Sequence, residues 1–146
     1  MLRLLIIAAD PLARAGLAAM FANEPDCLIA GQITPDDEDL AATAMLFRPD
    51  ALLVDTGWEG PSIQVYLDEL KSLELPTVAL LADGVEISDL LSLGVTGVLP
   101  RSSAPAIITA ALKAVELGLF VTVPAELERI LPRSESAPYP LFEGLT

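Results

Sequence analysis

Five short apolar runs, each separated from the next by a stretch with helical character, constrain this chain more than any other feature. The runs are Leu2–Ala9, Cys27–Ile33, Ala51–Asp55, Thr77–Ala82 and Thr96–Pro100. The first, third and fourth contain almost no polar residues, which is typical of strands in a parallel sheet that is covered on both faces. We therefore predict five buried strands.

The stretches between these runs carry the start and stop signals of helices. Asp10–Pro11, Thr34–Pro35 and Pro61–Ser62 are starts, and Gly94 and Gly118 are stops. The expected helices span residues 11–23, 36–47, 61–73, 85–93 and 105–117. Strands and helices alternate, so the predicted fold class is α/β, a doubly wound open sheet with right-handed crossovers. In such folds ligands bind at the carboxyl ends of the strands.

Composition excludes several classes of function. The 146 residues suffice for one domain with an aliphatic core, and the net charge of -13 leaves few cations for phosphate contacts, so this chain itself is not expected to bind nucleic acid. There is no histidine and one cysteine, Cys27, which leaves zinc, haem and iron–sulfur sites almost without ligands. Only a hard cation held by carboxylates remains. No signal-peptide pattern or membrane-length run is present, so we expect a cytoplasmic protein without membrane association.

Three aspartates follow predicted strands at the same edge of the sheet. Asp10 precedes Pro11, a pattern in which aspartate caps a helix, and Asp83-Gly84 is typical of a turn. Asp55 has no such local explanation, because it closes an apolar strand and enters a glycine-containing loop. Asp55 is therefore the best candidate for a site residue, with a solvated strand-end carboxylate as the alternative.

Several stretches resemble one family. DPLARAGLAAMFANEPD, RPDALLVD, GVTGVLPRSSAP and AVELGLFVTVPAEL are similar to the first helix, third strand, fifth strand and exit of response-regulator receiver domains of the NarL/FixJ type, the CheY-like modules of LuxR-type transcription factors. The likeness covers residues 1–131. It implies a five-stranded parallel sheet of order 2-1-3-4-5 flanked by five helices. It also puts Asp55 at the phosphoacceptor position and makes residues 132–146 a linker toward a C-terminal helix-turn-helix domain.

The resemblance also shows where this chain departs from the family. The acidic magnesium-binding pair falls on Ala8 and Ala9, with Asp10 one position late. The hydroxyl residue, the aromatic switch residue and the phosphate-contacting lysine become Leu81, Val98 and Arg101. Any remaining metal ligands would be Asp10, Asp55 and the carbonyl of Gly57. Arg101 is expected either to pair with Asp55 or to point into solvent.

These departures predict a degenerate, non-enzymatic receiver that is held in one conformation and binds Mg²⁺ weakly if at all. Two alternatives stay open. One is an ordinary phosphoacceptor that uses Asp10 as a metal ligand and receives phosphate from a histidine kinase. The other is a sensor of a small anion or metabolite at the strand ends. A nucleotide-binding enzyme is disfavoured because no glycine-rich loop follows the first strand.

The last expected helix has two apolar stripes. Ile108, Ala111, Leu112 and Val115 are expected to face the sheet. The second stripe consists of Ile107, Ala110, Ala114 and Leu117. It predicts a homodimer interface through this helix, alone or together with the first or the fourth expected helix, and the alternative is an inert alanine-rich surface. The acidic run at residues 36–39 is interpreted as a helix cap, and Trp58 as a lid over Asp55 or a partner contact.

Overall fold

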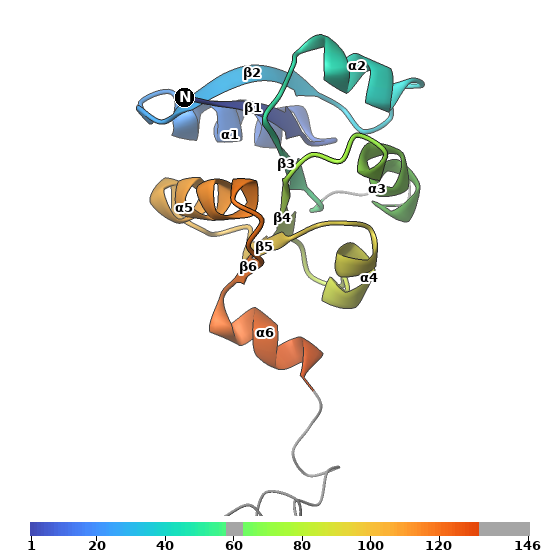
Figure 1. Ribbon diagram of the computed structural model, residues 1–146, viewed down its shortest axis with the longest axis vertical. Coiled ribbons are helices and arrows are strands. Elements are labelled where there is room, and N and C mark those ends of the chain that lie inside the picture. The colour runs from blue at the N-terminus through green and yellow to red at the C-terminus, as the bar shows by residue number, and fades with distance from the viewer. Residues whose placement is uncertain (58–62, 132–146) are drawn as a thin grey trace, which may run out of the picture.

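The computed structural model describes residues 1–57 and 63–131, and these form one parallel sheet covered by helices on both faces (Figure 1). The strand order is β2-β1-β3-β4-β5-β6. The strands are β1 (Leu2–Ile7), β2 (Cys27–Ile33), β3 (Ala51–Asp55), β4 (Thr77–Leu81), β5 (Gly97–Pro100) and β6 (Val121–Thr122). The helices are α1 (Pro11–Phe21), α2 (Leu40–Leu46), α3 (Ile63–Lys71), α4 (Ile87–Ser92), α5 (Pro105–Glu116) and α6 (Pro124–Ile130).

The five predicted strands and their order are confirmed, and the count of five strands and five helices is corrected by one strand and one helix. β6 pairs in parallel with β5, and α6 follows it directly. A two-residue strand is too short to show any periodicity, and α6 contains no buried residue, so it has no apolar stripe to reveal it. The predicted linker at residues 132–146 lies outside the described residues, and the domain boundary at residue 131 stays a prediction.

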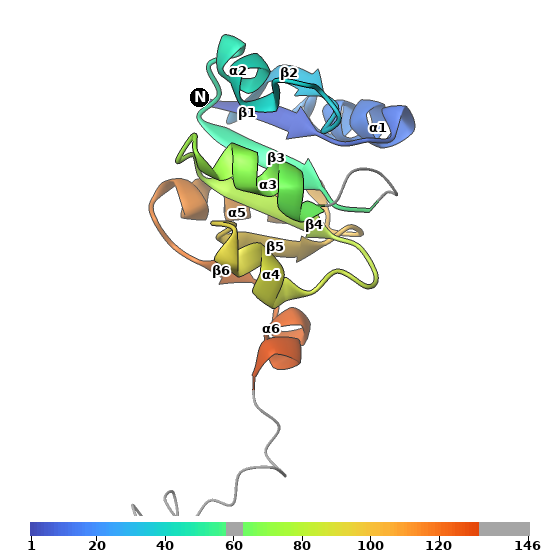
Figure 2. The same cartoon turned by 90° about the vertical axis from the view of Figure 1, so that its right-hand side faces the viewer.

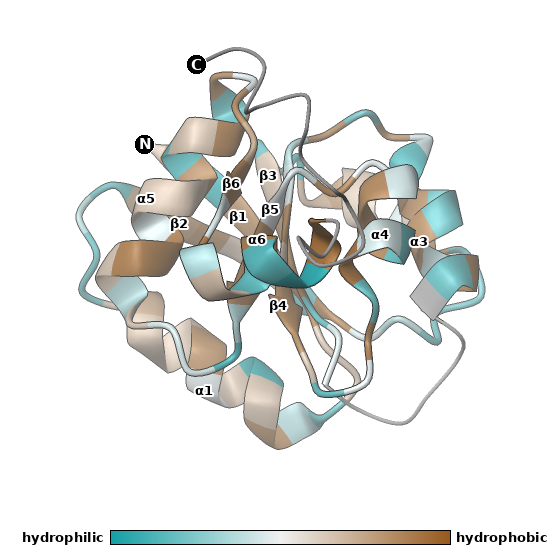
Figure 3. Ribbon diagram, turned by 90° about the horizontal axis from the view of Figure 1, so that it is seen from below, coloured by the Kyte–Doolittle hydropathy of each residue, from teal (hydrophilic) through white to brown (hydrophobic). Residues whose placement is uncertain are grey.

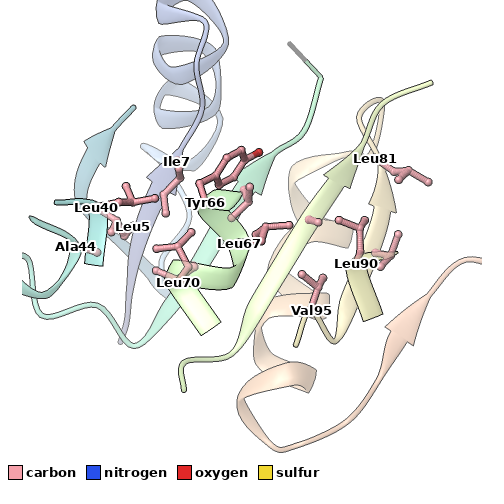
Figure 4. Close-up of a cluster of buried hydrophobic side chains, with 14 of the residues drawn as sticks. Leu5, Ile7, Leu40, Ala44, Tyr66, Leu67, Leu70, Leu81, Leu90 and Val95 are labelled. Atoms are coloured by element: carbon pink, nitrogen blue, oxygen red, sulfur yellow. The ribbon is translucent and has the colours of Figure 1, made fainter. Parts of the chain in front are cut away.

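The central strands are apolar throughout because they are buried on both faces. Alternate residues of β1 point to opposite sides, so that Leu5 and Ile7 pack under α2, α3 and α4, whereas Leu4 and Ile6 pack under α1 and α5. Figure 2 shows the two layers on either side of the sheet. Figure 4 shows the first of these cores, in which Tyr66 lies among aliphatic side chains. Each face of the sheet therefore has its own aliphatic core.

Helix α5 divides as its two stripes predict. Ile108, Ala111, Leu112 and Val115 are buried against the sheet. On the opposite side Ile107 and Leu117 remain 49% and 78% exposed, Ala110 is exposed and Ala114 is half-buried. The outer stripe is thus an apolar surface that nothing in the described part of the chain covers.

Helix ends follow local chemistry in some places and depart from it in others. Asp10 caps α1 by accepting from the backbone N–H of Leu12, and Gly94 and Gly118 adopt positive φ at the predicted stops. The acidic run does not cap α2, which begins only at Leu40 without a side-chain cap. Its aspartates bond within the preceding turns instead, as the bond from the Thr34 hydroxyl to Asp36 illustrates.

Helix α6 lies at the β6 edge of the sheet, next to α4 (Figure 1). Its Ile130 is half-buried against the apolar core beneath α4. None of the helices in the described residues combines the length and apolar character that a bilayer crossing requires.

The buried phenol of Tyr66 makes stability depend on alkaline pH. Burial, and then the negative charge of Asp55, raise the pKa of Tyr66 from 10.0 to about 12. The folded-state pKa lies above the unfolded value, so this contribution is fully present below pH 10 and is lost as the pH rises toward 12. A shift of two pKa units corresponds to roughly 3 kcal/mol in the free energy of unfolding.

We predict that the free energy of unfolding falls by up to about 3 kcal/mol between pH 9.5 and 12 in the native chain. Tyr66→Phe removes the ionisable group and should flatten this part of the profile. Urea unfolding of both proteins across that range measures the difference, which cancels the titration of other groups. Parallel profiles for the two proteins would contradict the assignment.

Candidate functional site

The candidate site is an ion pair at the carboxyl edge of the sheet. Asp55 ends β3 with a side chain that is only 3% exposed, and Arg101 follows β5 with a side chain that is 43% exposed. The guanidinium contacts both carboxylate oxygens: Nη2 donates to Oδ2 at 3.0 Å, and Nε lies 2.8 Å from Oδ1 in an ion-pair contact. This is the paired alternative of the two that the sequence leaves open for Arg101, and its geometry is the two-pronged grip that a planar guanidinium favours.

Gly57 completes the coordination of the carboxylate. Its backbone N–H donates to Oδ1 of Asp55 at 3.1 Å. A Cβ on Gly57 would lie 2.2 Å from Cζ of Arg101, so the guanidinium lies directly against the glycine backbone. Both oxygens of Asp55 therefore have donors from the protein itself, and the glycine is required for the fit.

Asp10 does not join this group. Its carboxylate accepts from the N–H of Leu12 at 3.1 Å and serves α1. The helix-capping interpretation of Asp10 is therefore supported by geometry, and the described contacts give no sign of a role in chemistry.

Arg14 is a residue whose role sequence reasoning missed. Its Nη1 donates to the carbonyl oxygens of Ala8 at 2.6 Å and Ala9 at 3.1 Å, in the turn between β1 and α1. An arginine four positions after a capping aspartate lies one helical turn inside the helix, and that spacing is the only sequence signal available. A guanidinium thus binds the backbone at the two positions where the family resemblance puts acidic residues.

Thr56 is a second missed residue. Its hydroxyl donates to the carbonyl of Leu80 at 2.7 Å and accepts from the N–H of Ala82 at 3.0 Å. The side chain is buried and joins the end of β3 to the end of β4. A threonine directly after a strand-end aspartate gives no pattern by which these two partners could be predicted.

The two remaining positions that matter are apolar and buried. Leu81 and Val98 both belong to the core beneath α4. Leu81 also lines a cleft of about 500 Å³ at the strand ends, together with Arg101, Asp83, Glu126 and Arg129. A smaller cavity of about 170 Å³ reaches the same ion pair from α1, between Leu17 and Met20. Figure 3, seen from the β6 side of the sheet, shows α6 in front of the strands.

The donor set does not fit Mg²⁺, which the fold would otherwise suggest. Ala8 and Ala9 have no side-chain oxygen, Asp10 is used as a cap, and both oxygens of Asp55 already bond to Arg101. Among residues 1–57 and 63–131, no group of three or more His, Cys, Asp or Glu side chains could hold a metal ion. Octahedral Mg²⁺ requires several oxygen ligands, and a guanidinium stands where such an ion would approach Asp55. Trp58 lies outside the described residues, so neither of its two expected roles is tested.

Comparison with known proteins identifies the fold. No family model matches the chain, and no curated protein sequence matches it. The structure is similar to a two-component response regulator of the LuxR family from Aurantimonas sp. SI85-9A1, with a TM-score of 0.72 at 17% identity over 93% of this chain and 97% of that one. It is also similar to the isolated REC domain of RcsB from Salmonella enterica serovar Typhimurium, solved with the phosphomimetic BeF3-, with a TM-score of 0.69 at 16% identity over 89% of this chain and 99% of that one.

A third similar structure is the signal receiver domain of the putative response regulator NarL from Mycobacterium tuberculosis. Its TM-score is 0.59 at 24% identity, over 79% of this chain and 96% of that one. Identities this low establish the architecture only. The chain therefore has the CheY-like fold of response-regulator receiver domains.

Proposed function

We propose that this chain is an atypical receiver domain, the cytoplasmic regulatory module of a LuxR-type transcription regulator, which acts through association rather than through Mg²⁺-dependent phosphorylation. The observation that carries the proposal is the ion pair in which Arg101 contacts both oxygens of the buried carboxylate of Asp55. The module has no enzymatic role. Its partners are a second copy of itself and its own DNA-binding domain, with a histidine kinase as the partner in the alternative function.

The ion pair opposes phosphoryl transfer to Asp55 in two ways. A carboxylate attacks a phosphoryl group effectively only when a divalent cation offsets the charge on the transferring oxygens. Here the acidic pair is missing at Ala8 and Ala9, and Arg14 already binds the backbone there. The attacking oxygens of Asp55 must also leave Arg101 before they can react. Both effects support impaired phosphorylation.

The positions that would carry a conformational signal are apolar. Leu81 and Val98 lie in the same hydrophobic core, and neither side chain has a polar group that an incoming phosphate could attract. The hydroxyl of Thr56, directly after Asp55, is committed to Leu80 and Ala82. These contacts support one standing conformation of the core around Leu81 and Val98.

The α1–α5 layer is the surface best suited to self-association. Its outer stripe exposes Ile107 and Leu117, and Leu119 and Phe120 continue the apolar surface beyond the helix. The charged residues of α1 and α5 are Arg14, Lys113 and Glu116, and the turns that flank α1 add Asp10, Glu24 and Asp26, of which Asp26 pairs with Lys113. On the other layer, acidic side chains dominate the helices and their flanking turns; they include Asp36, Asp37, Glu38, Asp39, Asp68, Glu69, Glu74, Asp83, Glu86 and Asp89.

Charge therefore favours one of the two layers as a homodimer interface. Two copies that meet through the acidic layer would repel each other, whereas the α5 stripe brings together apolar surface of nearly balanced charge. In a two-fold symmetric contact the same patch meets its own copy, so a patch of one charge sign repels itself and is unsuitable as the interface. This argument supports an interface through Ile107, Ala110, Ala114 and Leu117.

The ion pair is energetically asymmetric because its members differ in burial. Arg101→Met would leave the buried carboxylate of Asp55 without a countercharge, and we predict a loss on the order of 3 kcal/mol in the free energy of unfolding. Asp55→Asn leaves only a half-exposed guanidinium, and we predict a change below about 1 kcal/mol. Chemical denaturation measures both.

The double variant Asp55→Asn/Arg101→Met is the matched control. It removes both charges and should recover most of the stability that Arg101→Met loses. Arg101→Lys keeps the charge without the planar fork and should fall in between. Equal losses for the two single variants would show that the pair does not hold the site as described.

The native chain should bind neither Mg²⁺ nor BeF3- at Asp55. We predict no rise in melting temperature with MgCl2 and beryllofluoride, and no acid-labile phosphate on Asp55 after incubation with acetyl phosphate. The control is the variant Ala8→Asp/Ala9→Asp/Arg101→Lys, which supplies oxygen ligands and removes the guanidinium. This variant should gain a Mg²⁺-dependent rise in melting temperature.

Two outcomes would replace the proposal with its alternatives. Phosphate on Asp55 of the native chain would establish an ordinary phosphoacceptor and make a histidine kinase its partner. A melting shift produced by a small anion without Mg²⁺ would favour a sensor at the strand ends.

We also predict that the native chain is a dimer by light scattering and sedimentation, and that Ile107→Glu and Leu117→Glu make it monomeric. A buried glutamate at either position would face its symmetry mate or an apolar wall. Val65→Glu is the matched control, because Val65 is an exposed apolar residue of α3 on the opposite layer. Loss of the dimer in the control, or a native monomer, would contradict the interface.

A further inference from the structure

Helix α6 is held to the domain by few contacts. None of its residues is buried, its first turn has no side-chain cap, and its main neighbour is α4. Only Ile130 reaches the apolar core. Because α6 is fixed this weakly, the free energy of one charged contact is enough to change how it docks.

The cleft of about 500 Å³ at the strand ends brings α6 close to the Asp55 site. Arg101 lines it from the strand side, and Glu126 and Arg129 line it from α6. The side chain of Glu126 is 14% exposed and accepts one bond, from Nη1 of Arg129 at 3.0 Å. Its carboxylate is thus well shielded from water and is held by a single N–H of a half-exposed arginine.

Arg101 has donors to spare for a second partner. A guanidinium carries five N–H groups, and the contacts with Asp55 use those of Nε and Nη2. Its side chain is nearly half exposed, so it can turn into the cleft without repacking any core. The free energy that keeps it on Asp55 comes from that buried carboxylate, and this preference ends when the carboxylate loses its charge.

We propose that Arg101 exchanges between Asp55 and Glu126, so that α6 reports the state of Asp55. With Asp55 charged, the guanidinium stays at the end of β3 and α6 is loosely docked. When the charge of Asp55 is removed, Arg101 pairs with Glu126 and fastens α6 to the strand ends. The proposal rests on one part of the proposed function, namely that Arg101 is paired with Asp55 in the native domain.

The structure indicates what this exchange would control. Two states with different contacts for one side chain are sufficient for a switch, provided that each state binds it differently. α6 is the last described element, so its docking fixes where the described domain ends. Arg101 would in this way connect a strand-end site to the docking of α6.

Hydrogen exchange of the full chain, read by mass spectrometry on fragments that cover α6, tests the exchange directly. Asp55→Asn removes the charge with little change in shape and should slow amide exchange in α6 by about threefold or more relative to the native chain. Asp55→Asn/Glu126→Gln removes the second partner and should return α6 to the native rate. Asp55→Asn/Arg101→Met removes the shared guanidinium and should do the same.

Two results would overturn the proposal. One is unchanged exchange in α6 of Asp55→Asn while its melting temperature shows a folded protein. The other is equal slowing in Asp55→Asn and Asp55→Asn/Arg101→Met, because the guanidinium would then be irrelevant. Neither result bears on dimerisation or on Mg²⁺ binding, so failure here is distinguishable from failure of the proposed function. Chemical denaturation of each variant shows that slower exchange is local to α6 and not a change in global stability.

Discussion

The structure depends on how one buried negative charge is compensated. A parallel sheet covered on both faces offers its strand-end carboxylates little water, and Asp55 is nearly inaccessible. Such a charge must be matched by a metal, a cation or a proton, and here the match is a guanidinium from the end of a neighbouring strand. The other residues at the carboxyl edge of the sheet are consistent with this internal countercharge. The alanines at the end of β1, the apolar residues on β4 and β5, and the glycine against the arginine are all compatible with a cation that is part of the chain.

The fold could be predicted from the sequence because the buried strands consist almost entirely of apolar residues. The alternation of such runs with capped helical stretches leaves one fold class, and the burial of Leu5, Leu53 and Ala79 agrees with it. The last strand and helix could not be predicted this way. β6 is held by a hydrogen bond from the backbone N–H of Val121 to the carbonyl of Thr96 and by one from the hydroxyl of Thr122 to the carbonyl of Val98. Neither hydrogen bond produces a periodic hydrophobic pattern in the sequence.

The site was predictable to a different degree at each position. Asp55 could be identified because a charge at the end of an apolar strand has no local explanation. For Arg101 the sequence left two orientations open, one paired with Asp55 and one pointing into solvent. The choice depends on the backbone distance between β3 and β5, which decides whether the long side chain reaches the carboxylate. The roles of Arg14 and Thr56 depend on carbonyl groups of other segments, which a residue pattern cannot specify. The acidic run at residues 36–39 misled for a related reason, because short polar side chains bond as readily within turns as at a helix start.

Gly57 places a steric constraint on the site. The guanidinium rests on its backbone with no room for even a methyl group, so any other amino acid there would push the arginine aside before it altered the fold. Relatives that have lost this glycine would therefore be expected to have lost the internal cation as well, and to balance the carboxylate by other means. The identity of a single residue in the loop after the third strand could thus separate descendants that carry their own countercharge from those that must recruit one from solution.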